Sequence, residues 1–421
     1  MPLLVDAIFV VIGVLAAPWW LSRMLIRGRH RTDWSGRFGR TPRLSPPPAG
    51  GRIVLHAVSV GEVGALRGLV EAIEKVPDLD VVIGSTTDTG VAHAKSLFGE
   101  RHTVVRWPLD FSFSVRRFLS SVQPTVVGMV ELEVWPNMTA ICRARGIRNV
   151  VITGRLSERS YRRYRLIRPL IRGMFGRLDA VGAQNRATAN RFIELGVPST
   201  HAHVTGNMKW DSACVPLAGP QRSAELAERL GIDRSRLLLV GGSTAPGEEI
   251  MLRDACPAGV QLLCAPRRPE WWDAAAVALS PCRRLTTAST SPTPTDRYLL
   301  DTIGDLSDAY GLADVVVVGR SFGELHGSDP IEPIARGAAT VIGPAVSDFQ
   351  DAVEILCRGN GLIQCEASEL AEVLAELLRD DAVRKKLASR GADVIQSQQG
   401  ATERSLQLLL GQQSASPPNL N

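Results

Sequence analysis

The residues best suited to do chemistry begin with Glu62, a carboxylate that follows an apolar run and opens a segment of helical periodicity. Residues 53–58 are mostly apolar, which is typical of a buried strand, and apolar residues then recur at helical spacing from Val63 to Ile73. Ligands of open α/β sheets bind beyond the carboxyl ends of the strands, so a carboxylate there can act on a substrate. A Glu in a first helical turn also stabilises the helix dipole by up to about 1 kcal/mol, and local context alone favours that role.

Two more charged groups in the N-terminal half follow the same pattern. Glu131 comes directly after the apolar run 126–130, and Lys209 lies in the polar segment 205–211. Charged groups at strand ends can stabilise charge that develops during a reaction, and a cation can meet a leaving phosphate. The alternatives are that Glu131 belongs to a helix cap and that Lys209 is simply solvated.

The C-terminal half carries residues suited to a phosphate and a ribose. A Gly-rich turn at 241–249 follows an apolar run, but it lacks the G-x-x-x-x-G-K-[ST] spacing of a P-loop and is a weak signal alone. Arg267 follows the next run and offers a bidentate fork to a phosphate. Later loops carry Asp305, Asp329 and Glu332, and a carboxylate that opens a helix can accept hydrogen bonds from ribose hydroxyls.

The apolar pattern predicts two sets of strands that would position these residues. They are expected near 52–58, 81–85, 103–107, 125–130, 149–153 and 179–182, and near 236–241, 260–265, 314–318 and 339–342. Helical periodicity between the runs favours right-handed βα units and parallel sheets. The predicted fold class is therefore α/β, with two Rossmann-like domains facing an interdomain cleft.

Changes of composition divide the chain. The predicted divisions are a membrane anchor (1–26), a basic segment with a Pro-rich linker (27–51), a first Rossmann-like domain (52–212), a linker (213–235), a second Rossmann-like domain (236–411) and a disordered tail (412–421). A chain of 421 residues has room for two such domains. The seven Cys lie singly, as reduced thiols do, and a net charge of +5 does not imply a nucleic-acid partner.

The N-terminal segment 3–25 is almost entirely apolar and about long enough to span a bilayer, with Trp19 and Trp20 near its end. Arginines follow it and no Lys or Arg precedes it. The positive-inside rule then predicts an uncleaved single-pass anchor in the plasma membrane, with the domains on the cytoplasmic side. A cleavable signal peptide is the competing interpretation. The arginines would meet anionic lipids, or would only set the topology.

The segment 155–177 holds eight arginines and is expected to be mostly helical. A face that packs on a sheet would hold Leu166, Leu170, Ile171 and Phe175, and an outward face would hold Arg159, Arg163 and Ile167. A solvated charged face is the usual role of such a helix. The scarcity of acidic partners favours instead a surface for anionic lipid or phosphate.

Taken together, the motifs resemble the bacterial 3-deoxy-D-manno-octulosonic acid (Kdo) transferase family. The resemblance rests on the following segments, in this order: HAVSVGE, VELEVWPN, TGRLSERS, AQN, TGNMKWD, GSTAPGEE, APRRPE, DTIGDL, VGRSF and DPIEP. The family implies a membrane-anchored GT-B glycosyltransferase of the inner membrane, which transfers Kdo from CMP-Kdo to a lipid A precursor with inversion. The implied partners are thus CMP-Kdo, the lipid A precursor and anionic lipids, with no metal and no further cofactor.

The resemblance also implies roles for individual residues. Glu62 would be the general base, and Glu131 and Lys209 would stabilise the transition state. The segments implied to bind CMP comprise Pro266, Arg267, Ile303, Gly304, Asp305, Asp329, Pro330, Ile331 and Glu332.

Three positions depart from the family pattern: Ala245 and Arg268 each replace a usual His, and Ser328-Asp329 replaces His-Asn. The resemblance implies that domain 52–212 binds the acceptor and that domain 236–411 binds the donor, and all three departures lie in the donor domain. They leave open a glycosyltransferase that uses another nucleotide sugar, or a membrane-tethered homologue without activity.

Overall fold

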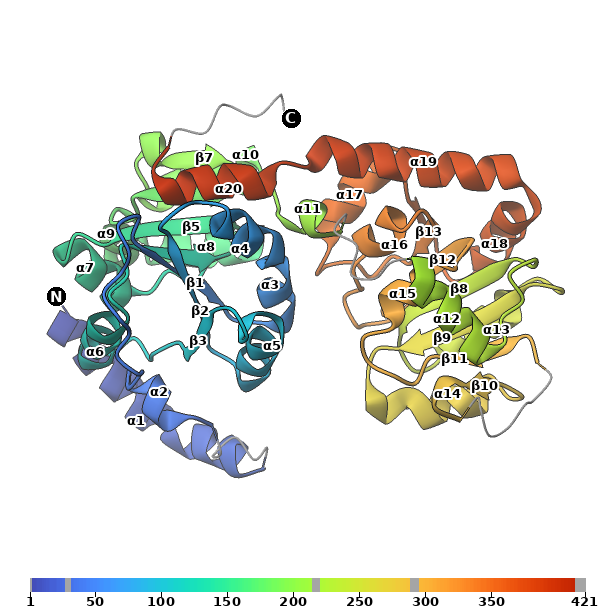
Figure 1. Ribbon diagram of the computed structural model, residues 1–421, viewed down its shortest axis with the longest axis horizontal. Helices are drawn as coiled ribbons and strands as arrows, with labels where there is room; N and C mark the ends of the chain where they lie inside the picture. Colours follow the sequence, from blue (N-terminus) through green and yellow to red (C-terminus); the bar gives the residue numbers. More distant parts are fainter. Residues whose placement is uncertain (1, 27–31, 214–219, 288–294, 413–421) are drawn as a thin grey trace. The chain divides into compact units, whose positions relative to one another are not determined.

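The computed structural model describes residues 2–26, 32–213, 220–287 and 295–412. The chain forms two compact units, one of Met1–Ser212 with Gln399–Asn421 and one of Ala213–Gln398 (Figure 1). The predicted linker 213–235 is partly helical, because α12 (Pro220–Leu230) packs on α15 (Leu306–Tyr310) of the second unit. Of the predicted tail, residues 413–421 lie outside the described residues.

The first unit is built on a parallel seven-stranded sheet of order β3-β2-β1-β4-β5-β6-β7. Its strands are β1 (Arg52–Ala57), β2 (Asp80–Ser85), β3 (Thr103–Arg106), β4 (Val126–Val130), β5 (Arg148–Gly154), β6 (Ala180–Ala183) and β7 (Ala202–Val204). All six residues of β1 are buried, as expected for a central strand of a sheet covered on both faces. Alternate residues serve opposite faces: Val54 joins one core and Leu55 the other.

The helices of the first unit are α1 (Pro2–Ile26), α2 (Trp34–Arg37), α3 (Val60–Ala65), α4 (Arg67–Glu74), α5 (Asp88–Phe98), α6 (Ser112–Val122), α7 (Pro136–Ala144), α8 (Glu158–Leu166), α9 (Arg168–Phe175), α10 (Arg186–Leu195), α11 (Lys209–Ala213) and α20 (Ala401–Leu410). Helix α20, red in Figure 1, lies along the first sheet and buries Leu406 and Leu409 in its core. Asp211 accepts hydrogen bonds from the backbone N–H groups of Gly400 and Thr402, at 2.7 and 2.6 Å, and so secures the start of α20. The second unit thus ends at Gln398. The sequence placed the end of the donor domain at 411, but residues 398–410 were also expected to pack back on the first domain, as α20 does.

The second unit holds another parallel seven-stranded sheet, of order β10-β11-β9-β8-β12-β13-β14. Its strands are β8 (Leu238–Thr244), β9 (Gln261–Pro266), β10 (Arg283–Arg284), β11 (Arg297–Leu299), β12 (Val315–Val318), β13 (Ala339–Ile342) and β14 (Ile363–Gln364). Its further helices are α13 (Glu248–Ala255), α14 (Trp272–Ala278), α16 (Ile331–Ala335), α17 (Gln350–Arg358), α18 (Leu370–Arg379) and α19 (Asp381–Gln398). The valines of β12 are all buried at the centre of this sheet.

The ten strands predicted from the sequence are confirmed, each within three residues at both ends. The structure adds β7, β10, β11 and β14, which lie toward the sheet edges and have two or three residues each. Strands this short carry too few apolar residues to show a period, so the sequence pattern does not predict them.

Helix α1 packs on α6 and α7 of the first unit. Asp6 accepts hydrogen bonds from the backbone N–H of Ser112 and from the side-chain amide of Asn137, at 2.8 and 2.9 Å. In the part of the chain that the structure describes, no helix combines the length and apolar character needed to cross a membrane, so the predicted anchor is not confirmed. The arginines at 27–31 lie outside the described residues.

The arginine-rich segment forms two helices, α8 and α9, in place of one. The break falls at Ile167, directly before Arg168 and Pro169, because Pro lacks the N–H that a continuous helix needs and fits a first helical turn. The predicted packing of Leu166 and Leu170 on the sheet is wrong: they are 83% and 82% exposed. The buried anchors of α8 and α9 are Tyr161 and Phe175.

Candidate active site

Glu62 lies at the start of α3, beyond the carboxyl end of β1, as predicted. Its Oε2 accepts a hydrogen bond from the backbone N–H of Val58 at 2.9 Å, and its Oε1 accepts one from the Ser59 hydroxyl at 2.8 Å. Ser59 in turn caps the helix by accepting from the backbone N–H of Glu62. This reciprocal pattern is a capping arrangement, which holds the carboxylate in one orientation at the strand end.

Glu131, Lys209 and Glu62 come together in the first unit. Burial raises the pKa of the Glu131 carboxyl, the charge of Glu62 raises it further, and Lys209 and Arg155 lower it. Glu131 has a φ of +59°, which is rare for a residue with a side chain and is typical of strained functional positions. Its backbone N–H donates to the carbonyl of Ile152 on β5 at 3.1 Å, so the neighbouring strand holds it there.

Two more charged residues belong to this cluster: Glu133, which the sequence suggested only as a helix cap, and Arg155, which it placed only in the arginine-rich segment 155–177. Burial raises the pKa of Glu133, a hydrogen bond from the Trp135 indole at 2.9 Å lowers it, and the charges of Glu62 and Glu131 raise it. Arg155, which follows β5, supplies a second cation beside Glu131. The only signal for Arg155 in the sequence was its position after an apolar run. Three carboxylates and two cations thus act on one another at this edge of the first sheet.

In the second unit, the end of β8 is distorted where the Gly-rich turn begins. Register with β9 shifts between Gly242 and Thr244, and Ser243 has a φ of +56°. A Cβ on Gly242 would lie 2.2 Å from the hydroxyl oxygen of Tyr310, so only Gly allows this contact. The turn is therefore shaped by the buried Tyr310 beneath it.

Glu248 at the start of α13 organises the loop that follows β12. Its carboxylate accepts hydrogen bonds from four backbone N–H groups: Ala245 at 2.8 Å, Arg320 at 2.7 Å, Ser321 at 3.0 Å and Phe322 at 3.2 Å. The Glu248 side chain is buried, so these charge-assisted bonds replace its hydration. They hold Arg320 at a φ of +59°.

This arrangement brings together three arginines from the ends of β9 and β12, the strands on either side of β8. Burial lowers the pKa of the Arg320 guanidinium, Arg267 and Arg268 lower it further, and Asp348 and Glu248 raise it. A guanidinium offers a planar fork of N–H donors that matches a phosphate, so the cluster suits a phosphate. Arg267 was predicted from the sequence; Arg320 was seen only as part of a strand-end loop.

The predicted residues Asp329, Glu332 and Arg267 all lie close enough to Tyr310 to act on its pKa. Burial raises the pKa of the Tyr310 hydroxyl, and the charges of Glu332 and Asp329 raise it further. A hydrogen bond with Ser243 and the charge of Arg267 act in the opposite direction and lower this pKa. All three predicted groups therefore surround Tyr310.

Glu332 has a distinct environment of its own. Burial raises its pKa, a hydrogen bond from Ser307 lowers it, Asp329 raises it and Arg336 lowers it. Arg336 donates to the Ser307 hydroxyl at 2.6 Å, which orients that hydroxyl toward Glu332.

The remaining predicted residues divide into loop-shaping and exposed groups. Pro266, Pro330 and Ile331 are buried and shape their loops. Ile303 is 81% exposed, and Gly304 has a φ of +105° that favours Gly. Asp305 accepts from Thr302 at 2.6 Å and lies 3.7 Å from the guanidinium of Arg222.

The three departures occupy different environments in the second unit. Ala245 is buried and donates its backbone N–H to Glu248. Arg268 is exposed, and its guanidinium lies 5.0 Å from the centre of the Trp271 ring. Ser328 is buried, and its hydroxyl has no hydrogen-bond partner among the described residues.

Comparisons with known proteins give this site its context. The family described as 3-deoxy-D-manno-octulosonic-acid transferase (kdotransferase) matches residues 32–212. The 3-deoxy-D-manno-octulosonic acid transferase of Haemophilus influenzae is 30% identical over 399 residues, which cover 90% of this chain and 91% of that protein. The transferase of the same name from Bordetella pertussis is 31% identical over 421 residues, covering 94% and 96%.

Solved structures with lower identity show the same fold. A UDP-GlcNAc 2-epimerase from Neisseria meningitidis, bound to UDP-GlcNAc, has a TM-score of 0.60 at 13% identity and covers 86% of this chain and 100% of its own. HepE of Anabaena, in complex with UDP and glucose, has a TM-score of 0.56 at 15% identity and covers 85% and 98%. The two parallel sheets are thus those of the GT-B architecture. The relatives of similar length show that the chain belongs to the 3-deoxy-D-manno-octulosonic acid transferase family of glycosyltransferases.

Proposed function

We propose that this enzyme transfers Kdo from CMP-Kdo to a lipid A precursor, with inversion at the anomeric carbon. The observation that carries the proposal is the cluster of Glu62, Glu131 and Lys209 at strand ends of the first unit, in a chain of the Kdo transferase family. Neighbouring carboxylates in different environments can take different roles, so one of them can accept a proton while the nearby cations stabilise negative charge.

In the proposed reaction, Glu62 acts as the general base. A hydroxyl oxygen of the acceptor forms a bond to the anomeric carbon of Kdo while its proton passes to the Glu62 carboxylate. The bond from that carbon to the phosphate oxygen breaks, and CMP leaves with the electron pair. Because Val58 and Ser59 hold the carboxylate by two hydrogen bonds, little reorientation is needed before the proton moves. Lys209 and Arg155 would stabilise negative charge near Glu131.

The donor would bind to the second unit. The guanidinium groups of Arg267 and Arg320 suit the phosphate of CMP, and Glu332 suits the ribose hydroxyls. The exposed Ile303 offers an apolar surface to the base. No step of this scheme is assigned to a metal or to a cofactor other than the donor substrate.

The direct test is transfer in solution. The purified full chain in detergent is incubated with CMP-Kdo and a tetraacylated lipid A precursor, and the lipid is analysed by mass spectrometry. An added mass of one or more Kdo units supports the proposal. Folded protein that transfers nothing at any CMP-Kdo concentration would contradict it.

A glycosyltransferase that uses another nucleotide sugar is the second candidate. Ala245, Arg268 and Ser328 favour it, because all three depart from the family pattern in the unit that would bind the donor. Competition separates the two: CMP should displace a fluorescent nucleotide from the protein at lower concentration than UDP does. The reverse order would support the other donor.

We further propose that the enzyme works at the cytoplasmic face of the inner membrane and contacts anionic lipid through α8 and α9. Leu166 and Leu170 are exposed, and six exposed arginines stand on the same two helices: Arg159, Arg162, Arg163, Arg165, Arg168 and Arg172. Apolar side chains among cations are typical of helices that lie in a membrane interface.

Changing Leu166 and Leu170 together to Ser should weaken binding to vesicles with anionic lipid by about tenfold or more, since each inserted Leu contributes about 1 kcal/mol. Flotation of the full chain with vesicles measures the effect. Val277→Ser is the matched control, because Val277 is 77% exposed but lies on α14 of the second unit. Equal binding by the double variant and wild type would contradict the proposed surface.

A further inference from the structure

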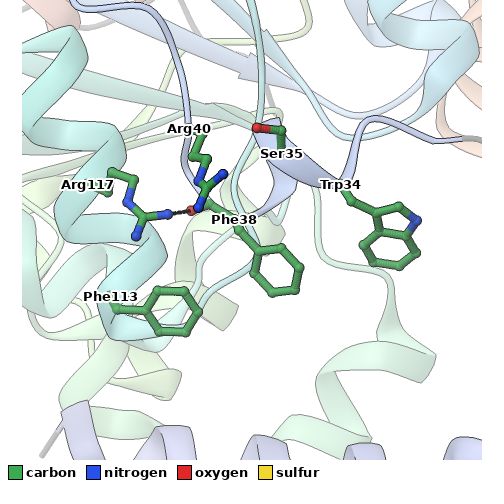
Figure 2. A pocket seen from close by; sticks show the side chains of 6 residues that line it. All are labelled: Trp34, Ser35, Phe38, Arg40, Phe113 and Arg117. Carbon is green, nitrogen blue, oxygen red and sulfur yellow. Dashed lines mark hydrogen bonds between the residues drawn. The ribbon is translucent and has the colours of Figure 1, made fainter.

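A pocket in the first unit is lined by aromatic and basic side chains that the proposed reaction does not use. It is formed by α2, the residues just after it and α6, and has a volume of about 470 Å³ (Figure 2). The lining residues are Trp34, Ser35, Phe38, Arg40, Phe113 and Arg117. This volume lies within the range of pockets that take small ligands or parts of larger ones.

The aromatic side of the pocket is one end of a series of ring contacts. Phe38 stacks on Trp34 at 6.2 Å and on Phe113 at 6.1 Å, measured between ring centroids. Phe113 stacks on Phe111 at 5.9 Å, and Phe111 meets Phe9 of α1 edge-on at 6.0 Å. The rings therefore link the pocket to a helix that exposes many of its own apolar residues.

The outer surface of this region is apolar to an unusual degree. Phe38 is 37% exposed and Phe113 is 49% exposed. On α1 the exposed large apolar residues are Leu3, Leu4, Ile8, Val10, Val11, Ile12, Val14 and Leu15. Exposed apolar residues gathered on linked elements in this way suit a partner that is itself apolar.

The basic side of the pocket indicates that the partner also carries a negative charge. Arg40 and Arg117 are both exposed beside the rings (Figure 2). A guanidinium N–H of Arg117 donates to the carbonyl of Phe38 at 3.1 Å, which holds the side chain at the pocket. Two arginines next to an apolar pocket complement a phosphate attached to a hydrocarbon chain.

Contacts connect α2 to the loop that bears Glu62. Arg37 of α2 donates to the carbonyl of Thr86 at 3.1 Å, and the hydroxyl of Thr87 donates to the carbonyl of Val58 at 2.7 Å. The backbone N–H of Val58 in turn donates to Glu62. Since residues 86 and 87 directly follow β2, the pocket stands at the same carboxyl edge of the sheet as the proposed base.

We propose that this pocket binds an acyl chain of the phosphorylated lipid acceptor, with Arg40 and Arg117 contacting its phosphate. The inference rests on the proposed function and adds a location for the acceptor's lipid part. The acceptor is favoured over bulk membrane lipid because the pocket shares the sheet edge with Glu62, where the acceptor's sugar hydroxyl must lie. The pocket would then select for acylated acceptors.

The test compares two acceptors in detergent solution: the tetraacylated, phosphorylated lipid A precursor and its fully deacylated form, which keeps the phosphates. Phe113→Ala should raise KM for the acylated acceptor about tenfold, as expected for a lost aromatic contact, and leave KM for the deacylated acceptor and for CMP-Kdo unchanged. Arg117→Ala should raise KM for both acceptors. The matched control is Arg116→Ala, since Arg116 is an exposed neighbour on α6 that does not line the pocket.

Three results would overturn the inference: an unchanged KM in Phe113→Ala, an equal rise for both acceptors, or weaker vesicle binding without any change in KM. The last result would assign the pocket to bulk membrane lipid. Titration calorimetry with dodecyl phosphate, below its micelle concentration, tests the pocket without catalysis. Binding that weakens about tenfold in Phe113→Ala supports the pocket even if wild type transfers no Kdo, whereas binding equal to wild type opposes it.

Discussion

Replacing Glu62 by Gln should reduce kcat for Kdo transfer by about 10²- to 10⁴-fold, the range that general bases contribute. The amide keeps the size of the carboxylate but cannot take the proton of the attacking hydroxyl. KM for CMP-Kdo should stay within about twofold, because Glu62 belongs to the first unit and the proposed donor site to the second. Initial rates measured by mass spectrometry of the lipid product give both parameters.

Because Glu62 also takes part in a helix cap, loss of activity needs a stability control. Ser59→Ala removes the hydroxyl that caps α3 and should lower the free energy of unfolding by about 1 kcal/mol. It keeps the carboxylate of Glu62, still held by the backbone N–H of Val58, so we expect kcat to fall far less than in Glu62→Gln. If Ser59→Ala and Glu62→Gln lose the same activity, the carboxylate serves the cap and another group is the base.

Replacing Glu248 by Ala should destabilise the second unit by about 3–5 kcal/mol. Four backbone N–H groups would lose their acceptor, and each buried donor left without a partner costs about 1–3 kcal/mol before relaxation or entry of water. The loop with Arg320 would also lose the contacts that hold its left-handed backbone. Hydrogen exchange should therefore speed up at the amides of residues 320–322, and CMP should bind more weakly.

Glu270→Ala is the matched control for this change. Glu270 is also in the second unit, but its carboxylate is exposed and lies 3.7 Å from the guanidinium of Arg268, so its removal should cost less than about 0.5 kcal/mol. Glu248→Gln should fall between the two, since its amide oxygen can still accept while its NH₂ group faces donors. Unchanged hydrogen exchange at 320–322 in Glu248→Ala would show that the four amides do not depend on this carboxylate.

The sequence was sufficient to predict the strands that carry the site and the turns that end them. Strands such as β4 and β12 are buried on both faces, so they need unbroken apolar runs, and a run of four or five such residues is visible without any structure. The position of Glu62 follows from the same pattern, because a strand that ends at a polar residue before a helical period leaves that residue at the sheet edge.

Features that depend on contacts between distant segments could not be predicted in this way. Arg155 and Lys209 reach Glu131 because β5 pairs with β4 and because the chain returns to this sheet edge at α11. Leu166 and Leu170 looked like core residues, but the break at Ile167 and the anchors Tyr161 and Phe175 turn them outward. A helical period shows which residues share a face; the packing partners settle which face is buried.

The bonds that secure the start of α20 and the amide bonds to Glu248 show the same limit, although the packing of residues 398–410 on the first domain was expected from the sequence. The start of α20 is held at the first unit by Asp211, which accepts hydrogen bonds from the backbone N–H groups of Gly400 and Thr402. These residues follow Asp211 by nearly half the length of the chain. Glu248 finds three of its four donors more than 70 residues away, in the loop after β12. Local sequence sets backbone preferences and apolar periods, which extend over a few residues. A partner brought close by chain folding leaves no signal at that range, so these contacts are visible only in the folded protein.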